Sequence, residues 1–366
     1  MAFKRTFTDP VPQSQERSYQ SKGVDTFHGR ARFTGRQTID VDGDVLDARY
    51  VLLATGAEPA KLGIAGEEHL VTNEEFLSLE ALPARISFVG GGYIAAEFAH
   101  IAAQSGAKVA VVQRGTRMLK TFDQDLVGWL MAKFQTLGID VQTGTSVERV
   151  EKFGDGFRVW TSRGVEKQSI EVDLVVHAAG RSPALSGLNL DAAGVETEGG
   201  RLKLNEFLQS VSNPAVYAAG DAAQVGPPLT PVSSHDAHVA TANMLKGNVR
   251  QPDYRGVPSV AFTVPPIAAV GLSEDQARAQ GFRFRVQSKH AGTWFTARQA
   301  AEPGYGFKVL VDEETDLVLG AHLVGPHADD IINLFALAIR HGLTATELKQ
   351  TMFAYPTGAS DIGYML

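Results

Sequence analysis

The hydrophobic residues of this chain fall into short runs that are typical of alternating strands and helices. In the most informative stretch, residues 85–112, an apolar strand leads into three glycines and then into a helix rich in small residues, Tyr93–Gln104. A second apolar strand follows at residues 108–112. This order of strand, turn, helix and strand is typical of a βαβ unit with a parallel sheet. The pattern therefore predicts an α/β fold organised around this unit.

The turn of this unit has the spacing G-x-G-x-x-G/A that is typical of dinucleotide-binding folds. Gly90 permits a tight turn, Gly92 lets the backbone approach a pyrophosphate, and Ala95 takes the place of the third small residue, which packs helix on strand. The N-terminus of the helix then faces the phosphates. The pattern predicts nucleotide contacts along Gly90, Gly91, Gly92, Tyr93 and Ile94. The alternative is a structural glycine turn without a ligand.

The residues after the second strand favour one nucleotide over the other. An NAD site usually has an acidic residue about 20 residues after the glycines, which binds the ribose hydroxyls. Gln113 and Arg114 occupy this place, and Arg117 and Lys120 follow. Basic side chains without a nearby carboxylate suit a 2′-phosphate, so the sequence predicts NADPH. The alternative is a solvated basic loop, because Arg and Lys are mostly exposed.

Three further apolar strands end in a glycine beside a polar residue. Residues 48–54 lead to Thr55-Gly56, residues 172–179 lead to Gly180-Arg181, and residues 214–219 lead to Gly220-Asp221. Backbone of this kind can come close to a ligand. A carboxylate at such a strand end is expected beside a sugar or polyol hydroxyl. A helix cap or a closed turn is the alternative for Asp221.

The rest of the chain supplies smaller elements. Strands are expected at residues 25–33 and 37–41, with a turn at Asp42-Gly43, and the helix that follows residue 125 is expected to end at Gly138. A meander is expected over residues 147–170. The C-terminal part combines strands at 257–264, 305–311 and 317–324 with a helix at 328–341 and a capping box at Thr344 and Glu347. This part is predicted to be an α+β module.

Composition excludes several classes of protein. The 366 residues carry a net charge of −7 without a basic run, which argues against nucleic acid or an anionic membrane surface as partner. No apolar run reaches the roughly 18 residues of a spanning helix, and no secretory signal is visible, so the cytoplasm is expected. Cysteine is absent, which excludes disulfides and thiolate chemistry within this sequence. His235 and His238 lack a third ligand nearby, and no metal is predicted.

Several motifs in order resemble the class I pyridine nucleotide-disulfide oxidoreductases, the group of glutathione reductase, mercuric reductase and dihydrolipoamide dehydrogenase. The resemblance implies a Rossmann-like NAD(P)-binding domain inserted in a partial FAD-binding domain, followed by an α+β dimerisation domain. The expected boundaries are 1–82 and 181–251 for the FAD-binding domain, 83–180 for the NAD(P)-binding domain and 252–366 for the dimerisation domain. The motifs are Ala54-Thr-Gly56, Gly90-Gly-Gly-Tyr-Ile-Ala-Ala-Glu97, Ala179-Gly-Arg181, Tyr217-Ala-Ala-Gly-Asp221, Leu229-Thr-Pro-Val232 and the segment 262–274.

The resemblance also implies cofactors and roles for individual residues. It implies FAD and NADPH as cofactors and a homodimer as the assembly. Asp221 would bind the ribityl chain of FAD, Tyr93 would gate the nicotinamide pocket, and Glu97 would lie near the flavin. The expected catalytic residues are Tyr93, Glu97 and Tyr355. The expected cofactor-binding residues are Thr55, Gly56, Gly90, Gly91, Gly92, Tyr93, Ile94, Glu97, Arg114, Arg117, Lys120, Gly180, Arg181, Gly220, Asp221 and Thr230.

Two departures from the family pattern limit the expected chemistry. Members of the family begin with a strand, glycine turn and helix for the ADP part of FAD and a Cys-x4-Cys pair, and this sequence starts downstream of both. The family's C-terminal His-Pro-Thr-x-x-Glu appears here as Tyr355-Pro-Thr-Gly-Ala-Ser360. Tyrosine, with an ordinary pKa near 10, is a poor proton shuttle at neutral pH, so disulfide reduction is not expected.

The sequence therefore predicts an NADPH-dependent FAD oxidoreductase that passes electrons to a small-molecule acceptor. The alternative is a dimeric NADPH-binding fragment or remnant that lacks flavin and turns nothing over.

Overall fold

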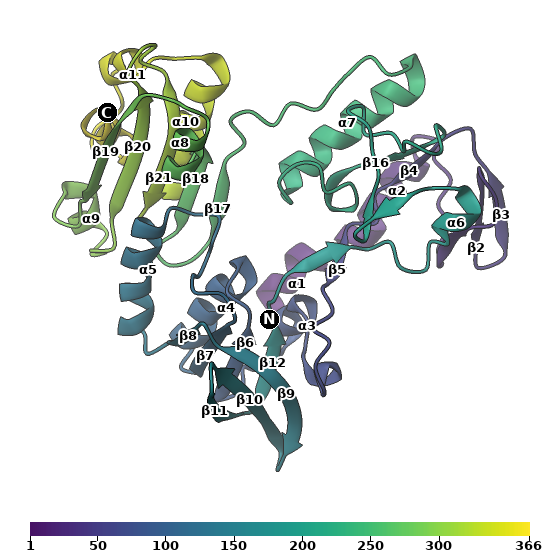
Figure 1. The fold of residues 1–366 in the computed structure, drawn as a ribbon, viewed down its shortest axis with the longest axis horizontal. Coiled ribbons are helices and arrows are strands. Elements are labelled where there is room, and N and C mark those ends of the chain that lie inside the picture. Colours follow the sequence, from purple (N-terminus) through teal and green to yellow (C-terminus); the bar gives the residue numbers. More distant parts are fainter. The chain divides into compact units, whose positions relative to one another are not determined.

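The computed structural model describes residues 1–366, which divide into two compact units (Figure 1). The first unit comprises Met1–Glu58 and Arg181–Tyr254, and the second comprises Pro59–Gly180 and Arg255–Leu366. The chain therefore passes between the units three times. None of its helices combines the length and the apolar character that a membrane crossing requires.

The second unit begins with a parallel sheet that confirms the predicted βαβ unit. Its four strands are β6 (Arg85–Val89), β7 (Lys108–Gln113), β8 (Asp140–Thr143) and β12 (Leu174–His177), in the order β12-β6-β7-β8. Helix α4 (Tyr93–Gln104) joins β6 to β7, and α5 (Gln124–Thr136) joins β7 to β8. Four of the five β6 residues are buried, as expected for a parallel strand that is covered on both faces.

Helix α4 packs closely on this sheet because the face it presents consists of small side chains. Ala95, Ala96, Ala99 and Ala102 are all fully buried. Helix α3 (Asn73–Ser78) adds Phe76, whose ring stacks on Phe98 of α4 with a centroid distance of 4.7 Å. These residues belong to one hydrophobic cluster that also takes in α5. The cluster holds the first turn of α4 against the end of β6.

The predicted meander is present as an antiparallel sheet after β8. It consists of β9 (Ser146–Phe153), β10 (Gly156–Arg163) and β11 (Glu166–Val172). Val150, Val159 and Val172 bury one face of the sheet. A short 3-10 helix, η1 (Glu67–His69), lies earlier in the chain and contacts β9.

The C-terminal module is built on a five-stranded antiparallel sheet with the order β17-β18-β21-β20-β19. Its helices confirm the predicted α+β module, and the helix predicted at 328–341 has those bounds. The strands are β17 (Ser259–Ala261), β18 (Ile267–Gly271), β19 (Phe284–His290), β20 (Gly306–Asp312) and β21 (Val318–Val324). The helices are α8 (Glu274–Ala279), α9 (Phe295–Gln299), α10 (Ala328–His341), α11 (Ala345–Gln350), η3 (Gly358–Asp361) and α12 (Ile362–Met365).

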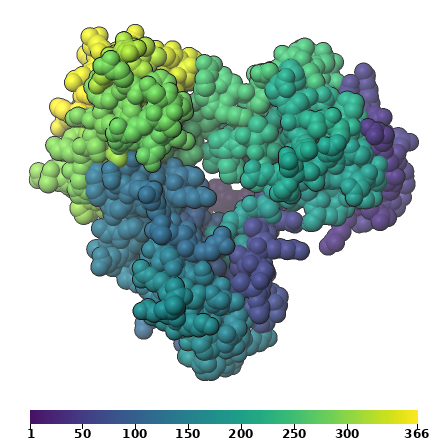
Figure 2. Space-filling view, in the orientation of Figure 1, coloured from purple at the N-terminus to yellow at the C-terminus, as the bar shows by residue number.

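The two faces of this sheet bury different partners within the second unit. Ala268 and Val270 of β18 point into the cluster that includes α10, whereas Ile267 of the same strand points into the cluster that includes α4 and α5. The alternation follows the two-residue period of a strand. The βαβ domain and the C-terminal module therefore share one hydrophobic cluster, and they are the neighbouring blue and green regions of Figure 2.

The first unit is assembled from short strands and contains a long helix, α7 (Thr230–Lys246). A three-stranded antiparallel sheet and a two-stranded parallel pair, β16-β4, carry its core. Its elements before residue 60 are α1 (Ala2–Thr8), α2 (Val11–Gln20), β1 (Ala31–Phe33), β2 (Thr38–Val41), β3 (Asp44–Asp47), β4 (Val51–Leu53) and β5 (Ala57–Pro59). Those after residue 180 are β13 (Arg181–Pro183), α6 (Leu190–Ala193), β14 (Thr197–Glu198), β15 (Arg201–Leu202), β16 (Val216–Ala218), η2 (Gly220–Ala222) and α7.

Several strands are shorter than the sequence predicts, and each difference has a physical reason. The strand expected at 25–33 forms only at Ala31–Phe33, and the strand expected at 48–54 forms only at Val51–Leu53. In both cases only these residues have a partner strand. The strand expected at 257–264 begins after Pro258 and forms only at Ser259–Ala261, the residues that pair with β18. The predicted turn at Asp42-Gly43 is present, with positive φ at both residues.

Candidate functional site

The turn between β6 and α4 has room for glycine alone at its first position. Gly90 has φ +121°, and its amide donates to the carbonyl of Val112 at 2.9 Å. A Cβ built on Gly90 would overlap the carbonyl oxygen of Ala178 and lie 2.6 Å from the Cα of Ala179. Backbone on both sides therefore fixes the position of this turn at the carboxyl ends of the strands.

The turn is open above its third glycine. A Cβ built on Gly92 meets nothing within 4 Å, whereas one on Gly91 would lie 2.7 Å from the sulfur of Met118. Gly92 is the N-cap of α4, which begins without a side-chain cap and without an acidic residue in its first turn. Amides in the first turn of a helix have no partner within the helix. Open space at an uncapped N-terminus suits an anionic group such as a pyrophosphate.

A basic loop follows β7 and is tied to the same turn. Arg114, Arg117 and Lys120 are exposed, and their side chains make no ion pair in the structure. The loop is held by Leu119, which is buried and whose amide donates to the Gly91 carbonyl at 2.7 Å. Gln113 contributes a second tie, because its Nε2 donates to the carbonyl of Arg117 at 3.1 Å. Three unpaired cationic side chains thus stand close to the open glycine turn.

Tyr93 and Glu97 lie one turn apart on α4. The ring of Tyr93 packs edge to face against Phe122, with a centroid distance of 5.4 Å. Glu97 accepts a hydrogen bond from the amide of Phe262 at 2.9 Å. Burial raises the pKa of the Glu97 carboxyl, and the hydrogen bond from Phe262 opposes that rise in part. A partly buried carboxyl with a raised pKa is common at functional sites.

The first unit carries the other predicted strand ends at one edge. Because β4 and β16 run parallel and Leu53 pairs with Ala218, Thr55-Gly56 and Gly220-Asp221 follow the carboxyl ends of adjacent strands. Gly220 has φ +62°, and a Cβ there would lie 2.6 Å from the Oγ of Ser233. Asp221, in η2, is partly exposed, and its carboxylate accepts no hydrogen bond from the chain. Thr230, the first residue of α7, is exposed.

A buried carboxylate that no sequence motif indicates holds this second turn. Asp236 of α7 is fully buried and accepts hydrogen bonds from the Gly220 amide at 3.1 Å and from the Tyr254 hydroxyl at 2.8 Å. Burial, together with the hydrogen bond to Asp236 and its charge, raises the pKa of the Tyr254 hydroxyl well above its usual range. Asp236 therefore fixes the backbone that presents Asp221.

Gly180 and Arg181 lie where the chain passes from the second unit to the first. Gly180 has φ +109° and accepts a hydrogen bond from the Ala60 amide at 3.1 Å. Arg181 donates to the carbonyl of Ala57, and β13 pairs with β5 at this point. His235 and His238 each make a hydrogen bond within the chain. His235 accepts from the Asp253 amide at 3.0 Å, and His238 donates from Nδ1 to the Ser234 carbonyl at 2.7 Å.

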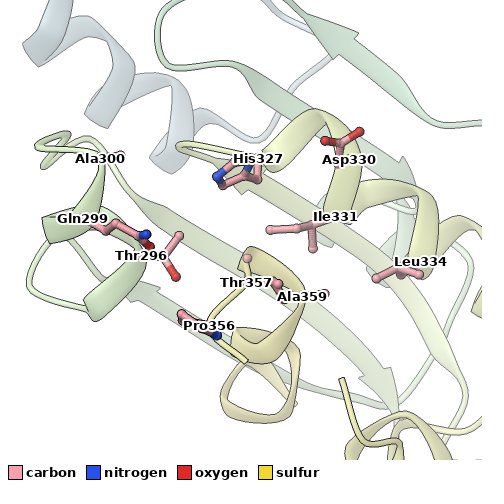
Figure 3. A pocket seen from close by; sticks show the side chains of 11 residues that line it. Thr296, Gln299, Ala300, His327, Asp330, Ile331, Leu334, Pro356, Thr357 and Ala359 are labelled. Atoms are coloured by element: carbon pink, nitrogen blue, oxygen red, sulfur yellow. The ribbon is translucent and has the colours of Figure 1, made fainter. Parts of the chain in front are cut away.

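Tyr355 lies in the C-terminal module, in the loop between α11 and η3. Its side chain is 77% exposed, and its ring lies 6.1 Å from that of Phe295, centroid to centroid. The residues that follow it line a cavity of about 620 Å³ together with α9 and α10 (Figure 3). His327 and Asp330 face this cavity from the start of α10. Tyr355 is thus accessible and is not bonded to another catalytic candidate.

The structure brings most of the predicted residues together in two groups, and Tyr355 in the C-terminal module belongs to neither. One group surrounds the Gly90 turn in the second unit, and the other surrounds the Gly220 turn in the first. The segment Pro59–Gly180, with its βαβ unit and glycine turn, is inserted between the two segments of a unit whose parallel strand pair also ends in glycine. These features define the class of protein: a multidomain α/β protein of the dinucleotide-binding type.

Comparisons with known proteins agree with this class. The family described as pyridine nucleotide-disulphide oxidoreductase matches residues 8–237, and the dimerisation domain of the same family matches residues 257–365. The mercuric reductase of Lysinibacillus sphaericus is 34% identical over 341 residues, which cover 92% of this chain and 62% of that protein. An uncharacterized 19.7 kDa protein in a mercuric resistance operon of Staphylococcus aureus is 51% identical over 180 residues, covering 49% of this chain and all of that protein.

A solved structure resembles the whole arrangement of elements. The HOCl-induced flavoprotein disulfide reductase RclA from Escherichia coli matches with a TM-score of 0.85 and 25% identity, over 93% of this chain and 79% of that chain. The chain belongs to the class I pyridine nucleotide-disulfide oxidoreductase family, whose members are NAD(P)H-dependent flavoproteins. It spans less than two thirds of the length of the Lysinibacillus enzyme.

Proposed function

We propose that this chain binds NADPH at the Gly90 turn and acts with FAD as an oxidoreductase toward a small-molecule acceptor. The observation that carries the proposal is the open space above Gly92, at an uncapped helix N-terminus beside three unpaired basic side chains. Gly90, Gly91, Gly92, Tyr93 and Ile94 would line the nucleotide. Arg114, Arg117 and Lys120 would bind its 2′-phosphate.

The first unit offers groups that suit a flavin nucleotide. Gly56 leaves backbone accessible at the edge of β4 and β16, and Asp221 has a carboxylate free to accept from the hydroxyls of a polyol chain. Thr55, Thr230, Gly180 and Arg181 complete the proposed set. When bound, FAD would accept the hydride and supply the redox chemistry, and the protein would orient the two cofactors.

The proposed roles of the side chains near the nucleotide follow from their contacts. Tyr93, supported by Phe122, would cover the nicotinamide. Glu97 would lie near the flavin, where its raised pKa favours an uncharged carboxyl more than in water. Tyr355 would donate a hydrogen bond but not shuttle protons, so disulfide reduction is not part of the proposal. We place the protein in the cytoplasm as a homodimer, with the C-terminal module as the interface.

The first test is the visible absorption spectrum of the purified chain before and after anaerobic addition of NADPH. A flavin band that bleaches on addition supports the oxidoreductase. A colourless protein that still binds NADPH supports a non-catalytic, nucleotide-binding dimer instead. The observation that favours this second candidate is the two-stranded sheet beneath the proposed flavin site, where β16 pairs with β4 and with no third strand.

Cofactor preference provides a second test. Arg114→Glu should lower the preference for NADPH over NADH by about ten- to a hundredfold, because it replaces a charge-assisted contact to phosphate with a like charge. Lys167→Glu serves as the control, because it makes the same change of charge on the exposed strand β11, outside the basic loop. The measurement is the dissociation constant of each nucleotide, from protein fluorescence. An equal preference for NADPH over NADH in the wild type and in the Arg114 variant would contradict the proposal that Arg114 binds the 2′-phosphate.

A further inference from the structure

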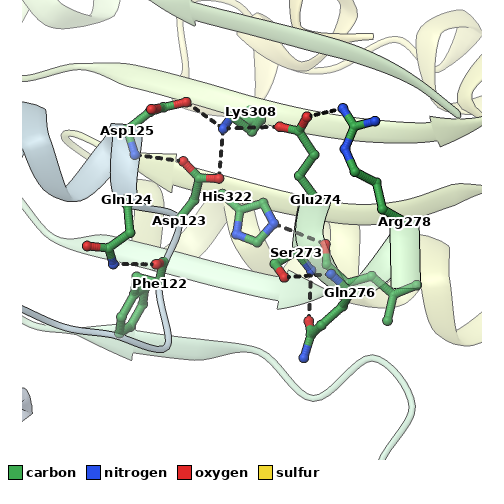
Figure 4. A network of polar contacts seen from close by, with 11 residues as sticks. Phe122, Asp123, Gln124, Asp125, Ser273, Glu274, Gln276, Arg278, Lys308 and His322 are labelled. Carbon is green, nitrogen blue, oxygen red and sulfur yellow. Dashed lines mark hydrogen bonds and ion pairs between the residues drawn. The ribbon is translucent and has the colours of Figure 1, made fainter. Parts of the chain in front are cut away.

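A buried lysine joins the C-terminal module to the start of helix α5. Lys308 of β20 is almost fully buried, with its side chain 7% exposed. Its ammonium lies 2.8 Å from Asp123, 2.6 Å from Asp125 and 3.6 Å from Glu274 (Figure 4). Asp123 and Asp125 belong to the nucleotide domain, and Glu274 belongs to α8. One cation therefore binds carboxylates from both parts of the second unit.

The surroundings of Lys308 keep its charge. Burial lowers the pKa of an ammonium, but the hydrogen bonds to Asp123 and Asp125 outweigh burial and hold the Lys308 pKa above its usual value. His322 is its cross-strand neighbour on β21. Burial lowers the pKa of His322, whose Nε2 donates to the Leu272 carbonyl at 3.1 Å. The other cation of the cluster is Arg278, which pairs with Glu274 at 2.6 Å.

Asp123 connects this lysine to the geometry of α5. It is the N-cap of the helix, and its Oδ1 accepts from the Asp125 amide at 3.0 Å while its Oδ2 binds Lys308. The next residue, Gln124, donates from Nε2 to the Phe122 carbonyl at 2.9 Å. An N-cap fixes the direction in which the chain enters a helix. Lys308 thus binds the residue at which the preceding segment enters α5.

That segment is the basic loop of the proposed nucleotide site. Phe122 donates through its amide to the Leu119 carbonyl at 2.8 Å, and Leu119 donates to the Gly91 carbonyl at 2.7 Å. The ring of Phe122 supports Tyr93. The contacts from Lys308 through Asp123 to Gly91 and Tyr93 are therefore continuous.

We propose that Lys308 is a positioning residue for NADPH: by fixing Asp123 from the C-terminal sheet, it sets the loop of residues 114–122 against the Gly90 turn. This inference rests on the proposed function, because it names a residue that tunes the same nucleotide site. Lys308 touches neither the turn nor the basic side chains, and it acts through Asp123.

The chain contains a matched control for this role. Lys133, near the other end of α5, forms an ion pair with Glu302 of the C-terminal module at 2.8 Å. This pair also joins α5 to that module, but it lies ten residues beyond Asp123 along the helix and away from the basic loop. Lys133→Met therefore removes an ion pair at the same interface without touching the N-cap.

The experiment compares the full-length wild type with Lys308→Met, Asp123→Asn and Lys133→Met. Asp123→Asn keeps a side-chain oxygen for the cap and removes the charge that Lys308 binds, so it carries the test if Lys308→Met folds poorly. Hydrogen exchange of residues 113–122 is measured without nucleotide, and the NADPH dissociation constant is measured by fluorescence titration. We expect faster exchange and about a tenfold weaker affinity in the first two variants. The Lys133 variant should match the wild type in both measurements.

The double variant Lys308→Met with Asp123→Asn separates positioning from general destabilisation. If Lys308 acts through Asp123, the double variant should bind NADPH no more weakly than the single variants. Unchanged loop exchange and unchanged affinity in Lys308→Met and Asp123→Asn, with only a lower melting temperature, would overturn the positioning role. A wild-type chain that binds no NADPH would overturn the proposed function, and this role with it.

Discussion

The two glycine turns of this protein obey one local rule in different surroundings. Gly90 and Gly220 each end a buried parallel strand with positive φ, and a helical segment follows each turn. Around Gly90 the space is closed by backbone, the carbonyl of Ala178 and the Cα of Ala179. Around Gly220 it is closed first by the side chain of Ser233. A motif thus predicts that glycine is needed, whereas the surrounding atoms determine how much a larger residue at that position would destabilise the fold.

The sheets beneath the two turns sharpen the contrast. The strand before Gly90 lies between two neighbours in a four-stranded sheet and belongs to a large hydrophobic cluster shared with the C-terminal module. The strand before Gly220 has β4 as its one neighbouring strand, with a single antiparallel bridge from Gln209 to Tyr217 on its other side, and it belongs to a smaller cluster. The same substitution is therefore expected to disturb more structure at Gly90 than at Gly220.

The largest effect is expected from Gly90→Ala. The added Cβ overlaps the Ala178 backbone and the residue must keep a φ that L side chains rarely adopt, so we expect a loss of about 3 kcal/mol or more in unfolding free energy. Urea denaturation measures it. Gly92→Ala is the control, because a Cβ there meets open space. We expect this variant to lose only about 1 kcal/mol or less, from the poorer N-cap, and to bind NADPH more weakly. An unchanged urea midpoint in Gly90→Ala would contradict the backbone clamp.

An intermediate effect is expected from Gly220→Ala. Its φ and the contact with Ser233 should together lower the unfolding free energy by about 1–3 kcal/mol. Adding Ser233→Gly removes the nearest obstructing atoms, so part of this loss should return once the cost of Ser233→Gly alone is subtracted. No neighbouring side-chain change can relieve Gly90 in this way. Full additivity of the two substitutions would show that Ser233 does not limit the turn.

The smallest effect concerns the carboxyl beside the nucleotide turn. Because burial raises the pKa of Glu97 in the folded state, the folded chain binds more protons than the unfolded one between the two pKa values. The Glu97 contribution to stability therefore falls as pH rises from about 4.3, the ordinary value. Glu97→Gln should melt slightly higher than the wild type at pH 7 and equally at about pH 3. A Glu97→Gln variant that melts below the wild type at pH 7 would show that the folded chain favours the ionised Glu97 carboxylate.

Local patterns predicted the parts of the fold that depend on neighbouring residues in the sequence. The βαβ order, the need for glycine at position 90, the helix at 328–341 and the capping box at Thr344 and Glu347 are all present. Each depends on contacts within a few residues, or on the periodicity of a single element. The basic loop after β7 could also be predicted, because its cationic residues lie close together in the sequence.

The parts that the sequence did not show depend on contacts between distant residues. The amide that Glu97 binds belongs to Phe262, 165 residues away, and Lys308 meets Asp123 across 185 residues. Asp236 is one polar residue on a mixed helix, and only its burial against Gly220 reveals its role. Strand lengths were overestimated for the same reason, because a strand ends where its partner ends.

The hydrogen bond between the Ala60 amide and the Gly180 carbonyl has a consequence for how such a protein can evolve. It brings together the entrance and the exit of the segment from Pro59 to Gly180, which holds the whole Gly90 turn and the basic loop. An insertion whose two ends meet can be exchanged or lengthened without rerouting the chain that hosts it. The first unit can therefore keep its chain connections when this segment changes, whereas the contacts between the segment and the C-terminal module, such as the Lys308–Asp123 ion pair, have to change together with it.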